Sequence, residues 1–250
     1  MTDPATSRPR RLTRPDSVVL HGEEIGTGPS VLLLHAGGEQ RQVWTPVTTL
    51  LSAAGFRCVA YDQRGHGESG GERKTFAPCA ADVGAMVLAE PPGCLVVGAS
   101  LGGLATLAAL ADPAVRDRVA RLVLVDVVPD IDPARARRFL ADAGVLDGYT
   151  ELVEDILAQL PRLRRLTATL DLPLRLVRAG TDTPLSDDDI ARFRNTAPHA
   201  TVTEIPQAGH LVARDQPAAL AAAIATECRH LRLGRGRGGR TAARSRVGGP

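Results

Sequence analysis

Aromatic residues and long apolar runs are both scarce in this chain of 250 residues. Phe, Trp and Tyr together make up only 3% of the residues, so aliphatic side chains have to fill the core. No apolar run approaches the roughly 18 residues that a membrane-spanning helix needs, so we expect no membrane partner. The segment Met1–Pro15 is polar and carries four arginines without an apolar stretch, which is unlike a secretory signal.

Cysteine is also sparse, and its spacing carries no recognisable chemistry. Cys58, Cys79, Cys94 and Cys228 form no C-x-x-C pair and no metal-ligand pattern. Because Cys58 and Cys94 fall in expected buried strands, we expect free thiols, which fit a reducing cytoplasm. The sequence contains no motif for a metal, a nucleotide or a flavin. We therefore expect a cytoplasmic protein without a cofactor.

The overall composition is that of one globular domain with an uneven charge. Hydrophobic residues make up 44% and charged residues 23% of the chain, as in ordinary soluble domains. Seven arginines and no acidic residue follow Glu227, and removing these seven charges from the net +2 leaves −5. The Gly/Arg-rich segment 233–250 predicts a disordered basic tail, for which we expect no nucleic-acid partner. We also expect a flexible segment over 1–16, which leaves 17–232 as the folded domain.

Short apolar runs alternate with helical stretches along most of the chain. This order predicts an α/β fold with a doubly wound, mainly parallel sheet flanked by helices. The segment 130–170 breaks the alternation with two amphipathic helical stretches, about Pro133–Ala143 and Tyr149–Leu160. We predict that it forms a short helical lid inserted between two strands. The expected strands are Ser17–His21, Val31–Leu34, Arg57–Tyr61, Leu95–Val97, Leu122–Val125, Pro173–Ala179 and Ala200–Ile205.

The stretch Gly98-Ala99-Ser100-Leu101-Gly102 joins a predicted buried strand to a predicted helix. A serine in such an abrupt turn needs a strained backbone, and the flanking glycines remove Cβ atoms that would clash. The serine is then exposed at the carboxyl end of the sheet and at a helix N-terminus, where free N–H groups favour negative charge. Ser100 is therefore our candidate nucleophile.

A nucleophilic serine needs a base, and the base needs an acid. His210 follows the last predicted strand, and a neutral imidazole there can take the serine proton and later return it. The acid has to follow a strand that lies between Ser100 and His210 in the chain. We favour Asp182 in this role, where it would fix the tautomer of the imidazole. Asp126, at the end of the preceding strand, is the alternative.

Acyl transfer also needs two backbone N–H groups that bind the oxyanion. The N–H group directly after the nucleophile, that of Leu101, is one candidate donor. The other is Gly37, in the glycine-rich loop after the strand Val31–Leu34. We expect His35 to support that loop rather than to take part in the reaction.

Four segments taken together resemble the α/β-hydrolase superfamily, especially its bacterial esterase, cofactor-free peroxidase-like and enol-lactonase branch. These segments are Leu34–Gly38, Tyr61–Ser69, Gly98–Gly103 and Gly209–His210. The resemblance spans roughly residues 17–231 and implies the same assignments: Ser100, His210 and Asp182 as the triad, with Gly37 and Leu101 as oxyanion donors. The loop Gly180-Thr181-Asp182 is one residue shorter than the Gly-x-x-Asp usual in the family.

Serine at the turn favours acyl chemistry, because epoxide hydrolases and haloalkane dehalogenases of this fold use aspartate there. The sequence thus predicts a serine hydrolase that acts on a small carboxylic ester, lactone or thioester through an acyl-enzyme. Two alternatives stay open. The same site could carry out cofactor-free perhydrolysis, C–C bond hydrolysis or a lyase reaction, or the chain could be a non-catalytic ligand-binding module.

Overall fold

An eight-stranded sheet forms the centre of the molecule, which is described here over residues 7–235 by a computed structural model. The strand order is β1-β2-β4-β3-β5-β6-β7-β8, and the six strands from β4 to β8 pair in parallel. Only β1 and β2 run antiparallel to their neighbours. The strands are β1 (Arg8–Thr13), β2 (Val19–Ile25), β3 (Ser30–Leu34), β4 (Arg57–Tyr61), β5 (Cys94–Ala99), β6 (Val119–Val125), β7 (Leu174–Ala179) and β8 (Thr201–Ile205).

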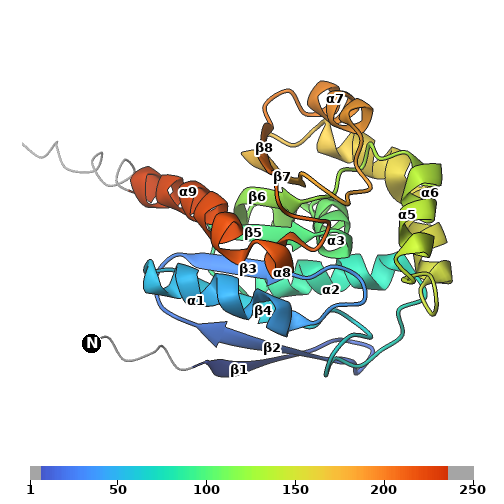
Figure 1. Cartoon of the computed structure of the whole chain (residues 1–250). Coiled ribbons are helices and arrows are strands. Elements are labelled where there is room, and N and C mark those ends of the chain that lie inside the picture. The colour runs from blue at the N-terminus through green and yellow to red at the C-terminus, as the bar shows by residue number, and fades with distance from the viewer. Residues whose placement is uncertain (1–6, 236–250) are drawn as a thin grey trace, which may run out of the picture.

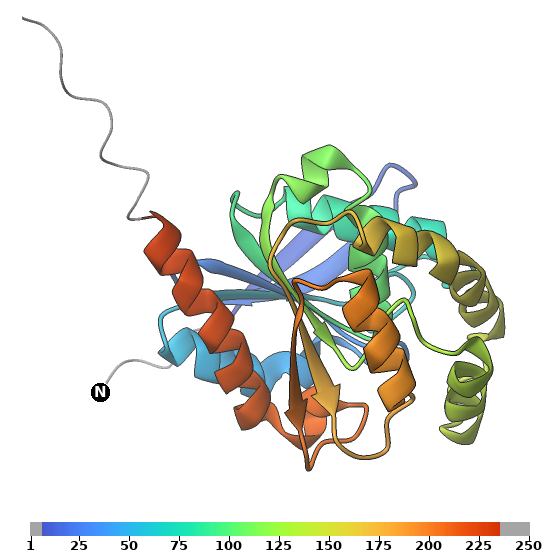
Figure 2. The same ribbon diagram turned by 90° about the horizontal axis from the view of Figure 1, so that it is seen from above.

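Helices cover both faces of this sheet, as predicted (Figures 1 and 2). In both views α1 and α9 lie on one face, and α2 and α3 lie on the other. The helices are η1 (Arg41–Trp44), α1 (Thr45–Ala53), α2 (Phe76–Leu88), α3 (Leu101–Ala109), α4 (Pro113–Arg116), α5 (Pro133–Asp142), α6 (Thr150–Thr167), α7 (Asp187–Thr196), α8 (Val212–Asp215) and α9 (Pro217–Arg235).

Two aliphatic cores follow from the alternation of side chains along the central strands. In β3, Leu32 and Leu34 belong to the core under α2, α3 and α6, whereas Val31 and Leu33 belong to the core under α1 and α9. Every residue of β3 and β5 is buried, because helices cover the sheet on both sides. Cys58, Cys79 and Cys94 are buried free thiols, as expected, and Cys228 is buried too.

The structure corrects the boundaries of the folded domain. We expected a flexible segment over 1–16, but Arg8–Thr13 form the edge strand β1, which pairs with β2. Helix α9 extends to Arg235, so it includes the first three residues of the expected basic tail. The rest of that tail, 236–250, lies outside the described residues.

The expected insertion at 130–170 contains two helices, α5 and α6, between β6 and β7. In both views they lie together at one end of the molecule. Helix α6 runs past Pro161, although we expected it to end at Leu160. The reason is that its apolar stripe continues through the buried Leu163, while Pro161 faces solvent.

Candidate active site

Ser100 lies on a sharp turn between β5 and α3. Its backbone has φ 46° and ψ −111°, a conformation that L-residues rarely adopt. A Cβ atom on Gly98 would approach the Gly103 backbone to 2.6 Å, and one on Gly102 would lie 2.6 Å from the Leu34 carbonyl oxygen. Glycine is therefore required on both sides of the serine, and the turn exposes the side chain of Ser100 at the carboxyl end of β5.

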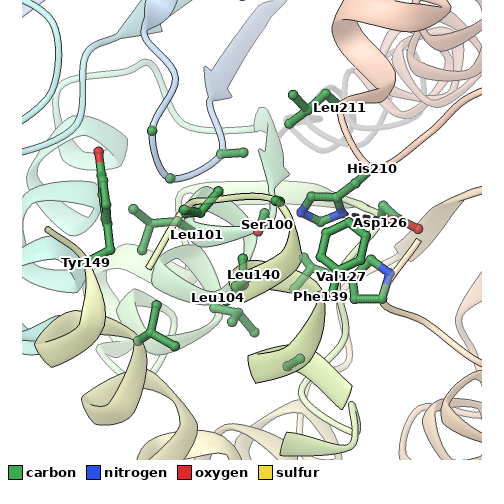
Figure 3. A pocket seen from close by; sticks show the side chains of 18 of the residues that line it. Ser100, Leu101, Leu104, Asp126, Val127, Phe139, Leu140, Tyr149, His210 and Leu211 are labelled. Atoms are coloured by element: carbon green, nitrogen blue, oxygen red, sulfur yellow. Dashed lines mark hydrogen bonds and ion pairs between the residues drawn. The ribbon is translucent and has the colours of Figure 1, made fainter. Parts of the chain in front are cut away.

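The His210 ring lies between Ser100 and Asp126 (Figure 3). The distance between His210 Nδ1 and Asp126 Oδ2 is 2.8 Å. The aspartate side chain is fully buried, while 12% of the histidine side chain is exposed. The Phe139 ring packs edge-on against the imidazole, with 5.2 Å between ring centroids. This places an oriented imidazole beside the serine.

Several donors fix the Asp126 carboxylate in the loop after β6. The Ala179 N–H group donates to Oδ1 at 2.9 Å, and the Thr183 hydroxyl lies 2.9 Å from Oδ1 and 2.7 Å from Oδ2. Asp126 has a φ of 48°, and its own N–H group donates to the Val177 carbonyl. Hydrogen bonds of this kind stabilise the charged form of a buried carboxylate.

Asp182 does not make the contact that we predicted for it. Its side chain is exposed, and its contribution to His210 is through the backbone, where its carbonyl accepts the His210 N–H at 3.0 Å. Asp182 has a φ of 37°, a left-handed conformation that L-residues rarely adopt. The carboxylate partner of His210 is therefore Asp126, the alternative candidate.

Gly37 and Leu101, our two candidate oxyanion donors, are neighbours at the same end of the sheet. A Cβ atom on Gly37 would lie 3.9 Å from Leu101 Cδ2. Leu101 opens α3, and N–H groups in a first helical turn have no intrahelical acceptor. The loop that carries Gly37 is adjacent to the nucleophile turn, and both residues line the same cavity as Ser100.

His35 supports that loop from beneath, as expected. The Gln63 N–H group donates to His35 Nε2 at 3.0 Å, so Nδ1 carries the proton that is shared with the Ala36 carbonyl at 2.7 Å. Burial lowers the pKa of His35 to about 4, which keeps the ring neutral. A neutral, fully buried ring fits a structural role.

A cavity of about 480 Å³ opens over Ser100, and α5 and α6 supply much of its wall. This volume is typical of a small-molecule site. Most of the wall is aliphatic, in keeping with the low aromatic content of the chain; Figure 3 shows Leu104 and Leu140 beside Val127 and Phe139. The other polar residues in its wall, besides Ser100, Asp126 and His210, are Glu39, Tyr149, Asp182, Arg214 and Asp215.

Sequence reasoning missed two contributors to the site. Thr183 binds Asp126, but a hydroxyl in a loop gives no signal in the sequence. Tyr149 lines the cavity from the start of α6, and its ring lies next to Gly37. Within residues 7–235 no cluster of three or more His, Cys, Asp or Glu side chains has a metal-binding arrangement. Each helix in the same range is too short or too polar to span a bilayer.

Comparison with known proteins gives consistent relatives. The family model described as "Alpha/beta hydrolase family" matches residues 31–223. An esterase of Mycobacterium tuberculosis is 29% identical over 248 residues, which cover 78% of this chain and 81% of the esterase. A pimeloyl-[acyl-carrier protein] methyl ester esterase of Vibrio campbellii is 34% identical over 155 residues, covering 61% of this chain and 58% of that protein.

The fold comparison agrees with the family match. A thermophilic esterase from Thermogutta terrifontis superposes with a TM-score of 0.74 at 22% identity, over 90% of this chain and 99% of the esterase. At that identity the likeness shows the fold alone, and the family match rests on the sequence. The match over more than three quarters of the chain shows that this protein belongs to the alpha/beta hydrolase family.

Proposed function

We propose that this protein is a serine hydrolase that cleaves a small carboxylic ester, lactone or thioester through Ser100, His210 and Asp126. The observation that carries the proposal is the 2.8 Å contact between His210 and the buried Asp126, beside a serine on a strained turn. The relatives named above as esterases support the same reaction class.

The first half of the reaction follows from the tautomer of His210. Asp126 Oδ2 accepts the Nδ1–H, so Nε2 is left as the acceptor. Nε2 takes the proton of Ser100 as the serine oxygen attacks the carbonyl carbon of the substrate. The buried carboxylate of Asp126 stabilises the imidazolium that forms, without itself taking the proton.

The tetrahedral intermediate carries its negative charge on the former carbonyl oxygen. The N–H groups of Gly37 and Leu101 donate to that oxygen, assisted by the positive end of α3. His210 then returns the proton to the leaving alcohol or thiol, and the acyl group remains on Ser100. A water molecule, activated by the same imidazole, hydrolyses the acyl-enzyme.

The cavity wall indicates the apolar part of the substrate. Aliphatic side chains from α5 and α6 surround the space next to Ser100, so burying an aliphatic acyl or alcohol group there is favourable. The volume of about 480 Å³ fits a small ester.

Fluorophosphonate labelling with peptide mass spectrometry tests the proposal directly. We expect labelling of the wild type at Ser100 and hydrolysis of short p-nitrophenyl esters. Ser100→Ala should abolish labelling and reduce kcat by at least about 10⁴-fold, because the nucleophile is lost. Ser52→Ala, on α1 and outside the cavity, is the matched control and should behave as the wild type.

The other outcomes point to the alternatives. Labelling at Ser100 without turnover of any ester would favour the perhydrolase, C–C hydrolase or lyase reading of the same site. A folded protein that neither labels nor turns over esters would contradict catalysis and favour the ligand-binding module.

A further inference from the structure

A second, polar pocket of about 720 Å³ lies next to the aliphatic cavity. The two share Gly38, Glu39, Tyr149 and Arg214 in their walls, so they adjoin at these residues. The remaining wall of the polar pocket comes from η1 and its preceding loop, from Pro46 of α1, from the loop after β4, from Arg73 and from Ala213 of α8. None of the triad residues lines this second pocket, and the mechanism above does not use it.

The pocket has an excess of positive charge. Of the two arginines in its wall, Arg214 is 3.1 Å from the carboxylate of Glu39. Arg73 has no ion pair with any carboxylate in residues 7–235. Asp182 and Asp215, two acidic residues in the wall of the neighbouring cavity, do not line the polar pocket. An anion would therefore be attracted to the side of Arg73.

Arg73 is also held in place. Its Nη1 donates to the Gly65 carbonyl at 2.7 Å, and its guanidinium carbon lies 4.3 Å above the centre of the Tyr149 ring. A guanidinium has five N–H donors, and the described residues provide a hydrogen-bond acceptor for only one of its nitrogens. Stacking on an aromatic ring leaves the planar edge of the group free to bind an anion.

His66, in the wall of the same pocket, has a buried ring nitrogen that needs a hydrogen-bond donor. The residue is only 4% exposed, and its Nδ1 lies 2.8 Å from the Arg64 carbonyl, so Nδ1 is the donor. Burial and the nearby charge of Arg73 lower the pKa of His66, which leaves Nε2 as an unprotonated acceptor. This Nε2 is buried without a hydrogen-bond partner among the described residues. Buried polar atoms are rarely left in that state, and an acceptor of this kind is satisfied by a water molecule or a hydroxyl group rather than by a carboxylate, so the recognition of an anion falls to Arg73.

We propose that the polar pocket binds a carboxylate carried by the ester substrate, with Arg73 as the cation that recognises it. This inference rests on the proposed function and narrows its substrate class to esters with an aliphatic part and a free carboxylate. The planar guanidinium matches a carboxylate in a bidentate pair. Tyr149 links the two sites, since its ring packs on Arg73 and its Cε1 would lie 4.0 Å from a Cβ atom on Gly37.

Three esters of similar length test the proposal, with turnover followed by acid release. Propyl butyrate is neutral, monopropyl glutarate carries a carboxylate on the acyl part, and the butyrate ester of 3-hydroxypropanoate carries one on the alcohol part. We expect the wild type to show a higher kcat/KM for at least one charged ester than for propyl butyrate. The better of the two charged esters identifies the part of the substrate that enters the polar pocket.

Arg73→Gln should lower the ratio of kcat/KM, charged ester over propyl butyrate, by about tenfold, the usual effect of losing a charge-assisted hydrogen bond. Arg73→Lys keeps the charge but loses the planar guanidinium. Its ratio of kcat/KM should lie between those of the wild type and Arg73→Gln. Arg165→Gln is the matched control, because Arg165 is exposed on α6 and lines neither pocket. Equal ratios in wild type and Arg73→Gln, or no preference for either charged ester, would overturn the proposal.

A binding measurement tests the polar pocket independently of the proposed hydrolase activity. Titration calorimetry with glutarate requires no turnover, so it applies even if none of the three esters is hydrolysed. Weaker binding of glutarate to Arg73→Gln than to wild type and Arg165→Gln would support the pocket in that case. A wild type that hydrolyses propyl butyrate but neither prefers a charged ester nor binds glutarate would refute the pocket and leave the esterase proposal standing.

Discussion

The loops after β6 and β7 each contain an aspartate with an unusual backbone conformation, but the two carboxylates have different surroundings. Each has an aspartate with a positive φ, 48° at Asp126 and 37° at Asp182. Asp126 is fully buried and accepts hydrogen bonds from the Ala179 N–H and the Thr183 hydroxyl, whereas the carboxylate of Asp182 is exposed. The position after a strand is therefore not enough to make an aspartate the partner of His210. The burial of its carboxylate and the hydrogen-bond donors around it distinguish Asp126 from Asp182.

Exchanging each carboxylate for an amide gives the largest expected contrast. Asp126→Asn should reduce kcat by about 10³- to 10⁴-fold, because an amide favours the wrong tautomer of His210 and cannot balance the imidazolium. Asp182→Asn should change kcat by less than about twofold, because it keeps the backbone carbonyl that accepts the His210 N–H and leaves the Asp126 contact in place. Ester hydrolysis measured on both variants, with circular dichroism as the check on folding, decides the matter. A large loss in Asp182→Asn with a small one in Asp126→Asn would reverse the assignment.

The difference between these two loops also explains what the sequence could predict. The turn at Ser100 was predictable, because buried apolar residues, glycines and a helix-forming run are adjacent in the chain. The choice between Asp126 and Asp182 depends on which carboxylate the fold buries beside His210 and supplies with hydrogen-bond donors. These partners come from segments far apart in the chain, so the sequence left both candidates open.

The edge strand β1 was missed for a related reason. Most side chains of Arg8–Thr13 are exposed and four of the six residues are charged or proline, so the segment has no apolar alternation to detect. It becomes a strand through pairing with β2, and Arg8 and Arg10 contact the carboxylate of Glu24 there. The parallel strands, by contrast, were recognisable because burial on both faces makes them continuous apolar runs.

His35 and His210 also differ in burial, and the burial of His35 predicts an effect of intermediate size on the pH dependence of stability. His35 is fully buried with its pKa lowered to about 4, whereas part of His210 reaches the cavity. Between pH 6.5 and 4 the unfolded chain binds a proton at His35 that the folded protein does not. The free energy of unfolding should therefore fall as the pH decreases through this window, by up to about 3 kcal/mol from this residue. His66, whose pKa is also lowered, acts in the same direction.

Urea unfolding at pH 7 and pH 4.5 measures this effect. His35→Gln should be less stable than the wild type at pH 7 but should lose less stability on acidification. His199→Gln, at an exposed position, is the matched control and should keep the pH dependence of the wild type. If the free energy of unfolding falls by the same amount in the wild type and in His35→Gln between pH 7 and pH 4.5, burial of a neutral His35 is not the source of the pH dependence.

The smallest expected effect concerns Thr183, which joins the two loops of the first comparison. It follows Asp182 directly, yet its hydroxyl donates to Asp126 and accepts the Leu185 N–H at 3.1 Å. Thr183→Val keeps the shape but removes the hydroxyl, and losing a hydrogen bond of about 1 kcal/mol should lower kcat roughly fivefold. Thr183→Ser restores the hydroxyl and should restore most of the activity.

A split between kcat and KM tells positioning from simple destabilisation in these variants. Thr183→Val should lower kcat while KM stays within about twofold, because the hydroxyl contacts Asp126 and Thr183 does not line the cavity. Urea unfolding of Thr183→Val and Thr183→Ser gives the change in stability beside the change in kcat. An equal loss of kcat in both variants that follows their loss of stability would mean that the loop after β7 affects only folding. In that case Asp126 would owe its orientation to the Ala179 N–H group and its own burial alone.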